Sequence, residues 1–135
     1  MLPKSNQSSR RILVADDDPV VVRVVTRVLA DAGYCVVVAR DGRETYRVLQ
    51  NDSDFRAAIF NMEMPHLQGI DIIRYMRTEN RLRRIPVVMM TANQNPDVQR
   101  ESFAAGATAF LLKPFTTQNV QTIMRLLGNA VVAAA

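Results

Sequence analysis

Short apolar runs that each end in a polar residue constrain the fold of this chain most strongly. They lie at residues 12–15, 57–60, 87–90 and 109–112. An apolar run of this length without alternation is typical of a strand that is buried on both faces of a sheet. Stretches with helical spacing separate the runs, and strands that alternate with helices indicate a parallel α/β sheet. We therefore predict one α/β domain.

The residues that follow these runs are polar and chemically complementary. They are Asp16, Asp17 and Asp18 after the first run, Asn61 after the second, Thr91 after the third and Lys113 after the fourth. The carboxyl ends of parallel strands meet at one edge of the sheet, where such folds build their sites. We expect a crevice lined by acids, an amide, a hydroxyl and an ammonium group.

The segments between the runs predict helices with recognisable ends. In the first, apolar residues repeat at helical spacing: Val21, Val24, Val25, Val28, Leu29 and Ala32. Pro19 suits the first turn of this helix and Gly33 its end. A further strand is expected at 35–39, with helices at 42–50 behind an Asp41 cap, at 70–78, and from Asn95 to Gly106. The last helix should place Val120, Ile123, Met124 and Leu127 against the sheet.

The motifs ILVADDDP, NMEMPHLQG, VMMTA and FLLKPF resemble, in order and spacing, the receiver domain of two-component response regulators. The resemblance covers residues 11–128, after a flexible lead-in at 1–10 and before a tail at 129–135. It implies a flavodoxin-like doubly wound (βα)5 fold with five parallel strands in the order 2-1-3-4-5. It also implies a module of a phosphorelay pathway rather than an enzyme.

The resemblance implies roles for the crevice residues. An aspartate in the place of Asn61 accepts a phosphoryl group in that family, with Mg²⁺ held by the acids of the first strand. The implied metal ligands are Asp16, Asp17, the side chain of Asn61 and the backbone carbonyl of Glu63, and the implied phosphoryl pocket and switch residues are Thr91, Ala92, Lys113 and Phe110. The Lys113–Pro114 peptide is expected to be cis.

Asn61 changes the chemistry expected of this pocket. An amide is not a useful nucleophile, so no acyl phosphate can form on it. Its neutral oxygen would still ligate Mg²⁺, but weakly. Losing one negative charge among acids should also stabilise the metal-free fold. Two origins stay open: the gene encodes asparagine and the domain signals without phosphorylation, or Asn61 replaces a natural aspartate in an engineered form.

Glu63 and His66 each allow two interpretations. The Glu63 side chain lies two residues beyond Asn61 in extended chain, so it can point into the pocket and stand in for phosphate, holding Lys113. We expect instead that it points outward into solvent. His66 is the only histidine, and its place in a loop argues against a role as a phosphate carrier.

The sequence also allows other classes of function. A Mg²⁺-dependent phosphatase-like hydrolase would use Asp16 as its nucleophile, and a phosphorylation-independent scaffold or dimerisation domain is also possible. The net charge of +4 suggests nucleic acid, but no recognition element is visible. The basic residues in one segment are therefore read as a solvated face: Arg74, Arg77, Arg81, Arg83 and Arg84.

The expected partners are a histidine kinase and phosphotransfer or downstream proteins, which would bind the face of the fourth helix, last strand and last helix. At 135 residues and 48% hydrophobic content, the chain can build one core. It has no apolar run long enough to span a membrane. We expect a cytoplasmic monomer or weak homodimer, with the single cysteine, Cys35, buried.

Overall fold

A computed structural model describes residues 10–134 of the protein, so all but the last residue of the lead-in predicted at 1–10 lies outside the described residues. The strands are β1 (Arg11–Ala15), β2 (Cys35–Ala39), β3 (Ala57–Asn61), β4 (Val87–Thr91) and β5 (Ala109–Leu112). The helices are α2 (Pro19–Asp31), α3 (Gly42–Asn51), α4 (Gly69–Thr78), α5 (Pro96–Ala105) and α6 (Thr117–Ala134). The last helix therefore continues through most of the segment 129–135, which the sequence predicts as a tail.

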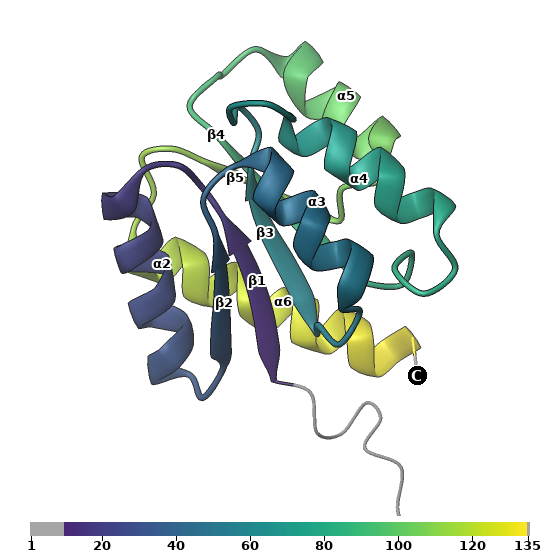
Figure 1. The fold of residues 1–135 in the computed structure, drawn as a ribbon. Helices are drawn as coiled ribbons and strands as arrows, with labels where there is room; N and C mark the ends of the chain where they lie inside the picture. Colours follow the sequence, from purple (N-terminus) through teal and green to yellow (C-terminus); the bar gives the residue numbers. More distant parts are fainter. Residues whose placement is uncertain (1–9, 135) are drawn as a thin grey trace, which may run out of the picture.

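The five strands form one parallel sheet in the order β2-β1-β3-β4-β5. Helices α2 and α6 lie on one face, and α3, α4 and α5 lie on the other (Figure 1). This is the predicted doubly wound arrangement, and its topology places the carboxyl ends of all five strands at one edge.

The core is divided by the sheet into two apolar layers. Alternate residues of β1 serve opposite faces: Leu13 and Ala15 belong to the layer under α3 and α4, and Ile12 and Val14 to the layer under α2 and α6. All four are fully buried, which explains why β1 reads as a continuous apolar run rather than an alternating one. In α6, Val120, Met124 and Leu127 are buried as predicted.

Side-chain caps and glycines set the helix ends. Asp18 caps α2, Asp41 caps α3 and Asn95 caps α5, each accepting a hydrogen bond from a backbone N–H of the first turn. Gly106 follows α5 with a φ of 119°, a conformation that side chains other than glycine rarely adopt. Ala32, which we placed in the apolar stripe of α2, is exposed because the helix has already ended before it.

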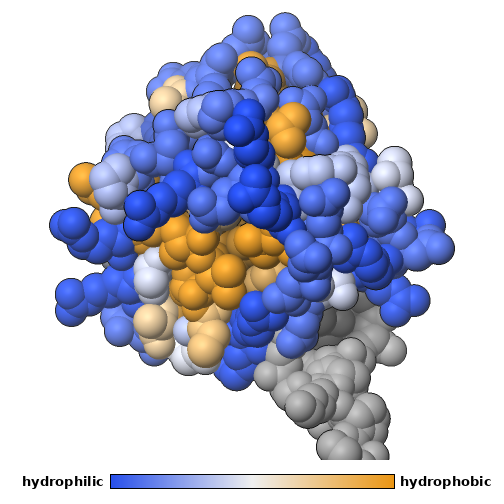
Figure 2. All heavy atoms as spheres, viewed as in Figure 1, coloured by the Kyte–Doolittle hydropathy of each residue, from blue (hydrophilic) through white to orange (hydrophobic). Residues whose placement is uncertain are grey.

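The prediction that Cys35 is buried was wrong, because its side chain is exposed. Cys35 is the first residue of β2, which pairs only with β1 and is therefore an edge strand. The next three residues, Val36, Val37 and Val38, are half-buried. Figure 2 shows an apolar patch where β2 lies in Figure 1, framed by hydrophilic residues.

Two arginines of the basic segment bond to backbone carbonyls elsewhere in the fold, and of these Arg77 is half-buried while Arg81 is exposed. Arg77 donates to the carbonyls of Gly106 at 2.8 Å and of Arg83 and Ile85 at 3.0 Å. Arg81 donates to the carbonyl of Leu49 at 2.8 Å. Burial lowers the pKa of Arg77 from its ordinary value.

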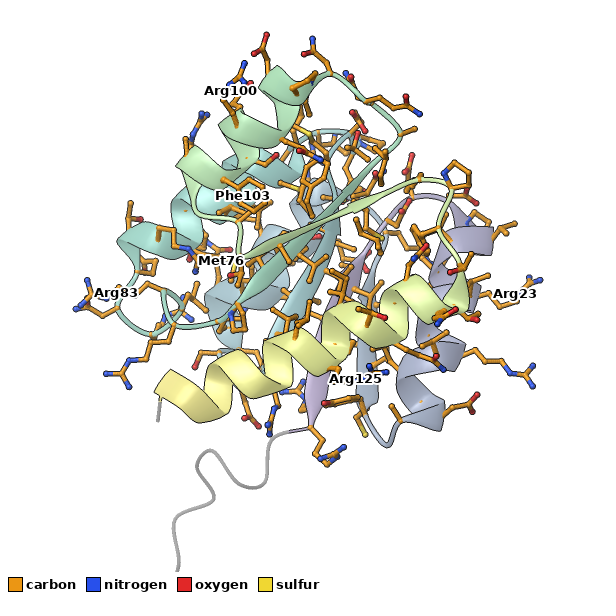
Figure 3. All side chains as sticks on the ribbon, turned by 180° about the vertical axis from the view of Figure 1, so that it is seen from behind. Arg23, Met76, Arg83, Arg100, Phe103 and Arg125 are labelled. Atoms are coloured by element: carbon orange, nitrogen blue, oxygen red, sulfur yellow. The ribbon has the colours of Figure 1, made fainter. Side chains whose placement is uncertain are left out.

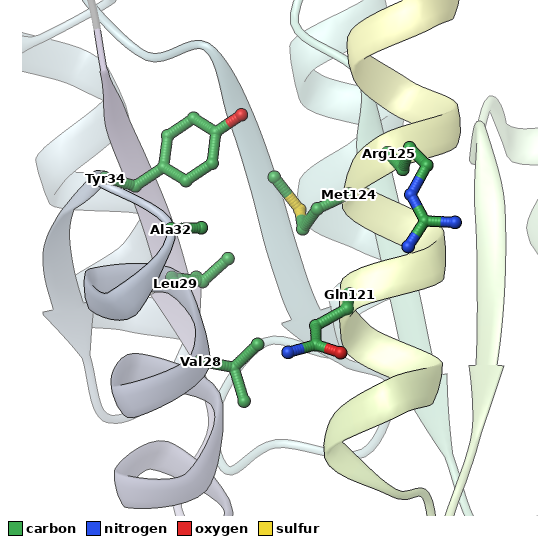
Figure 4. A pocket seen from close by; sticks show the side chains of 7 residues that line it. All are labelled: Val28, Leu29, Ala32, Tyr34, Gln121, Met124 and Arg125. Carbon is green, nitrogen blue, oxygen red and sulfur yellow. The ribbon is translucent and has the colours of Figure 1, made fainter.

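The molecule also has a shallow groove between α2 and α6, visible in Figure 4. Its lining includes Leu29, Tyr34 and Met124.

Within the described part of the chain, no helix combines the length and the apolar character that a membrane crossing requires.

Candidate functional site

The polar strand ends meet as the sequence predicts, and Lys113 joins two of them. Its Nζ donates to Oδ2 of Asp16 at 2.9 Å and to Oδ1 of Asn61 at 3.1 Å. Burial raises the pKa of Asp16, whereas the backbone N–H of Asp18 and the ammonium of Lys113 act to lower it. The side chain of Asp16 is fully buried, so this ion pair supplies the positive charge that a buried carboxylate requires.

Both polar atoms of the Asn61 side-chain amide form hydrogen bonds. Its Nδ2 donates to the backbone carbonyl of Glu63 at 2.7 Å and to Oδ1 of Asp17 at 3.3 Å, while its Oδ1 accepts from Lys113. The opposite orientation of the amide would direct its NH₂ at an ammonium and its oxygen at two other oxygens. The hydrogen-bond network therefore fixes which way the amide lies.

Glycines allow the loop after β3 to pack closely beside this network. A Cβ on Gly69 would lie 2.6 Å from the carbonyl oxygen of Asn61, so α4 can begin this close to the site only at a glycine. A Cβ on Gly42 would clash with the backbone of Leu67 in the same loop. His66 lies in this loop with a φ of 74°.

Glu63 is exposed, as we expected, but its carboxylate also bonds to a residue of the pocket. Its carboxylate accepts the Thr91 hydroxyl, with Oε2 at 2.9 Å and Oε1 at 3.1 Å. The exposed carboxylate therefore bonds to Thr91 and not to Lys113, the partner in the alternative interpretation. Lys113 already lies between Asp16 and Asn61.

Thr91 continues the network into the loop before α5. It is fully buried, and its Oγ1 accepts the backbone N–H of Asn93 at 3.1 Å while donating to Glu63. Sequence reasoning treated Asn95 only as a helix cap and missed Asn93. The signal available was the spacing of two in Thr91-x-Asn93-x-Asn95, since these residue types bond to backbone N–H groups two residues ahead.

The remaining predicted residues do not bond to Lys113 or Asn61, and Phe110 lies within β5 against the apolar core. Ala92 is exposed, and Asp18 caps α2 instead of facing Lys113. Phe110 is half-buried, and its ring centroid lies 6.2 Å from that of Phe103 on α5. Figure 3 shows Phe103 between α5 and the sheet. The Lys113–Pro114 peptide is cis, as the resemblance implied.

This doubly wound fold, with acids, a hydroxyl and a lysine at successive strand ends, defines the class of protein. Residues 12–125 match the family model described as the response regulator receiver domain. The chain therefore belongs to the receiver domain family.

Several particular proteins are similar to this one. The chemotaxis protein CheY of Pseudomonas aeruginosa is 32% identical over 108 residues, which cover 80% of this chain and 87% of that protein. The solved structure of the chemotaxis regulator CheY4 of Vibrio cholerae superposes with a TM-score of 0.82 at 29% identity, covering 89% of this chain and 99% of that one.

A third similar protein was solved with a metal ion. The receiver domain of the sensor histidine kinase PA1611 from Pseudomonas aeruginosa has a magnesium ion coordinated in its active-site cleft. It superposes with a TM-score of 0.79 at 29% identity, covering 90% of this chain and 99% of that chain.

Proposed function

We propose that this protein is a receiver-type signalling module that acts through protein contacts without ordinary aspartyl phosphorylation. The observation that carries the proposal is the position of Asn61, at the end of β3 with its side-chain oxygen 3.1 Å from Lys113. Asp16, Asp17 and Thr91 surround it at neighbouring strand ends. The side chain that would receive phosphate is thus an amide in an otherwise complete pocket.

The geometry also argues for weakened Mg²⁺ binding. Resemblance assigned the cation to Asp16, Asp17, the side chain at 61 and the backbone carbonyl of Glu63. Here the Asn61 amide nitrogen donates to the Asp17 carboxylate and to the Glu63 carbonyl, so a partial positive charge lies between two of those oxygens. Reversing the amide would offer its oxygen to the metal but would place its NH₂ against Lys113. This arrangement supports weakened binding of the cation.

Partner binding follows from the family, in which receivers contact histidine kinases, phosphotransfer proteins or downstream proteins. We place this contact on the face formed by α5, β5 and α6. Three large apolar side chains are exposed on these elements: Phe103 at 47%, Leu112 at 37% and Leu126 at 58%. Exposed apolar side chains on these elements favour a protein partner over nucleic acid or membrane. We propose a monomer or weak homodimer in the cytoplasm.

The hydrolase alternative is less well supported by the contacts of Asp16. One of its carboxylate oxygens accepts the backbone N–H of Asp18 at 2.9 Å, and the other accepts Lys113 at 2.9 Å. A nucleophilic carboxylate needs an oxygen that can reach a substrate. Because both oxygens are bonded and the side chain is fully buried, Asp16 serves better as an anchor for Lys113.

The experiment that tests the proposal is intact-mass measurement after incubation with Mg²⁺ and acetyl phosphate. The protein and its Asn61→Asp variant are treated side by side. We expect a phosphoryl adduct on the aspartate variant alone. An adduct on the unaltered protein would contradict the proposal, because another side chain would then be the acceptor. Absence of an adduct on both proteins would contradict the claim that the rest of the pocket is complete.

A further inference from the structure

We propose that Glu63 is the resident anion of this pocket and that it holds the start of helix α5 through the Thr91 hydroxyl. This inference rests on the proposed function in one respect, because α5 belongs to the face assigned to partners. It adds a regulatory role for the Glu63 side chain, whereas the resemblance assigned only the backbone carbonyl of this residue to the site. The conformation of α5 would then be set from within the chain.

The first step is the contact between the carboxylate and the hydroxyl. Both Glu63 oxygens lie within 3.1 Å of Thr91 Oγ1. Hydrogen bonds to an ionised group are shorter and stronger than neutral ones. Thr91 is fully buried, and its hydroxyl has the Glu63 carboxylate as its acceptor. The hydroxyl is therefore directed at Glu63.

The second step links the orientation of the Thr91 hydroxyl to the start of α5. A hydroxyl that donates to Glu63 presents its lone pairs to the N–H of Asn93, at 3.1 Å. The side-chain oxygen of Asn93 accepts the N–H of Asn95 at 2.9 Å, and that of Asn95 accepts the N–H of Asp97 at 2.9 Å. The last bond is the N-terminal cap of α5. An uninterrupted series of hydrogen bonds joins Glu63 to the first turn of the helix.

The other end of α5 is held independently of Glu63. The carbonyl of Gly106, directly after the helix, accepts from Nη2 of Arg77 at 2.8 Å. In the helix itself, the buried Ser102 hydroxyl lies 3.8 Å from the Met62 sulfur. Only the first turn of α5 should respond when Glu63 is changed, whereas the last turn stays anchored.

The test is hydrogen exchange of individual backbone amides by NMR, using the full chain without phosphate donor or metal. In Glu63→Ala we expect the amides of Asn93, Asn95 and Asp97 to exchange about tenfold faster, because a hydrogen bond to a charged group is lost. Glu63→Gln keeps a neutral acceptor and should show a smaller increase. The amides of residues 104–107 should not change. Glu79→Ala is the matched control, since Glu79 lies beyond the far end of α4, about 15 Å along that helix.

Thr91→Val tests the same series of hydrogen bonds at a second position, because it removes the hydroxyl with little change in volume. The double variant with Glu63→Ala should exchange no faster than either single variant if both substitutions break one series of bonds. The proposal is overturned if Glu63→Ala behaves like Glu79→Ala. It is also overturned if exchange rises equally at 93–97 and 104–107, which would indicate general loosening, or if the two substitutions add.

These outcomes are distinguishable from failure of the proposed function. Exchange reports on the isolated chain and requires neither a partner nor phosphorylation. If Asn61→Asp gains no phosphoryl group but Glu63→Ala still loosens 93–97, the link to α5 stands and the receiver proposal fails. If the phosphoryl group is gained but exchange is unchanged, the receiver proposal stands and the role of Glu63 fails.

Discussion

Replacing Asn61 by aspartate should destabilise the metal-free protein. Two hydrogen bonds donated by the amide nitrogen, to the Glu63 carbonyl at 2.7 Å and to Asp17 at 3.3 Å, are lost. In their place, an aspartate oxygen faces a carbonyl oxygen and a second carboxylate. Asn61 is only 6% exposed, so water can relieve little of this conflict. The contact with Lys113 is the one interaction that the new charge improves.

The size of the effect follows from these contacts. Attraction to Lys113, at 3.1 Å, and repulsion from Asp17, at 3.3 Å, are similar in distance and opposite in sign, so they largely cancel. What remains is the loss of two hydrogen bonds, at about 1 kcal/mol each. The expected cost is therefore about 2 kcal/mol of unfolding free energy, or a decrease in Tm of about 6 to 10 °C for a domain of this size.

Thermal unfolding of both proteins in the presence of EDTA at pH 7 measures this difference. Asn61→Ala serves as a control, because it removes the same hydrogen bonds without adding a charge. An aspartate variant that melts at the same temperature as the unaltered protein, or higher, would refute the reasoning. It would mean that the charge at position 61 is accommodated without cost in this pocket.

Two further substitutions test other parts of the account. Lys113→Met leaves Asp16 buried without its cation and should cost about 3 kcal/mol at pH 7. Burial raises the pKa of Asp16 above its ordinary value of 3.8, so the ionised carboxylate lowers the stability of the fold at pH values above 3.8. Loss of Lys113 raises this pKa further. The deficit, measured by urea unfolding, should therefore shrink from pH 7 towards pH 4; a constant deficit would contradict the role of this ion pair. Arg77→Met removes the bonds to three backbone carbonyls and should cost about 2 to 4 kcal/mol in the same assay. Arg84→Met on the surface should cost less than about 0.5 kcal/mol. Equal effects of the two substitutions would show that Arg77 is not structural.

Apolar periodicity was sufficient to predict the sheet and its helices. The runs 12–15 and 87–90 are buried on both faces and could only be central strands, and the caps Asp41 and Asn95 were readable because they precede helical stretches. Residues that end neighbouring parallel strands lie close together, so the approach of Asp16 and Asn61, after β1 and on β3, was also predictable. Lys113 follows β5, which β4 separates from β3, and its long side chain reaches Asn61 across this gap.

The directions of individual side chains were not predictable in the same way. Glu63 could be placed on the same side of the chain as Asn61, but its bond to Thr91 depends on how closely the ends of β3 and β4 approach. Arg77 reads as one basic residue among several, because its carbonyl acceptors at Gly106, Arg83 and Ile85 belong to loops whose path the sequence pattern does not specify. Cys35 was misjudged because apolar neighbours do not distinguish an edge strand from a central one.

In the proposed function, the Asn61 amide nitrogen lies between two of the oxygens that would hold Mg²⁺ and weakens the binding of this cation. Titration of Mg²⁺ into the unaltered protein and into Asn61→Asp, followed by NMR at the backbone amides of Asp17 and Glu63, tests it most directly. We expect Mg²⁺-dependent shifts at these amides at lower Mg²⁺ concentrations in the aspartate variant than in the unaltered protein. Equal Mg²⁺ affinity in the two proteins would contradict it.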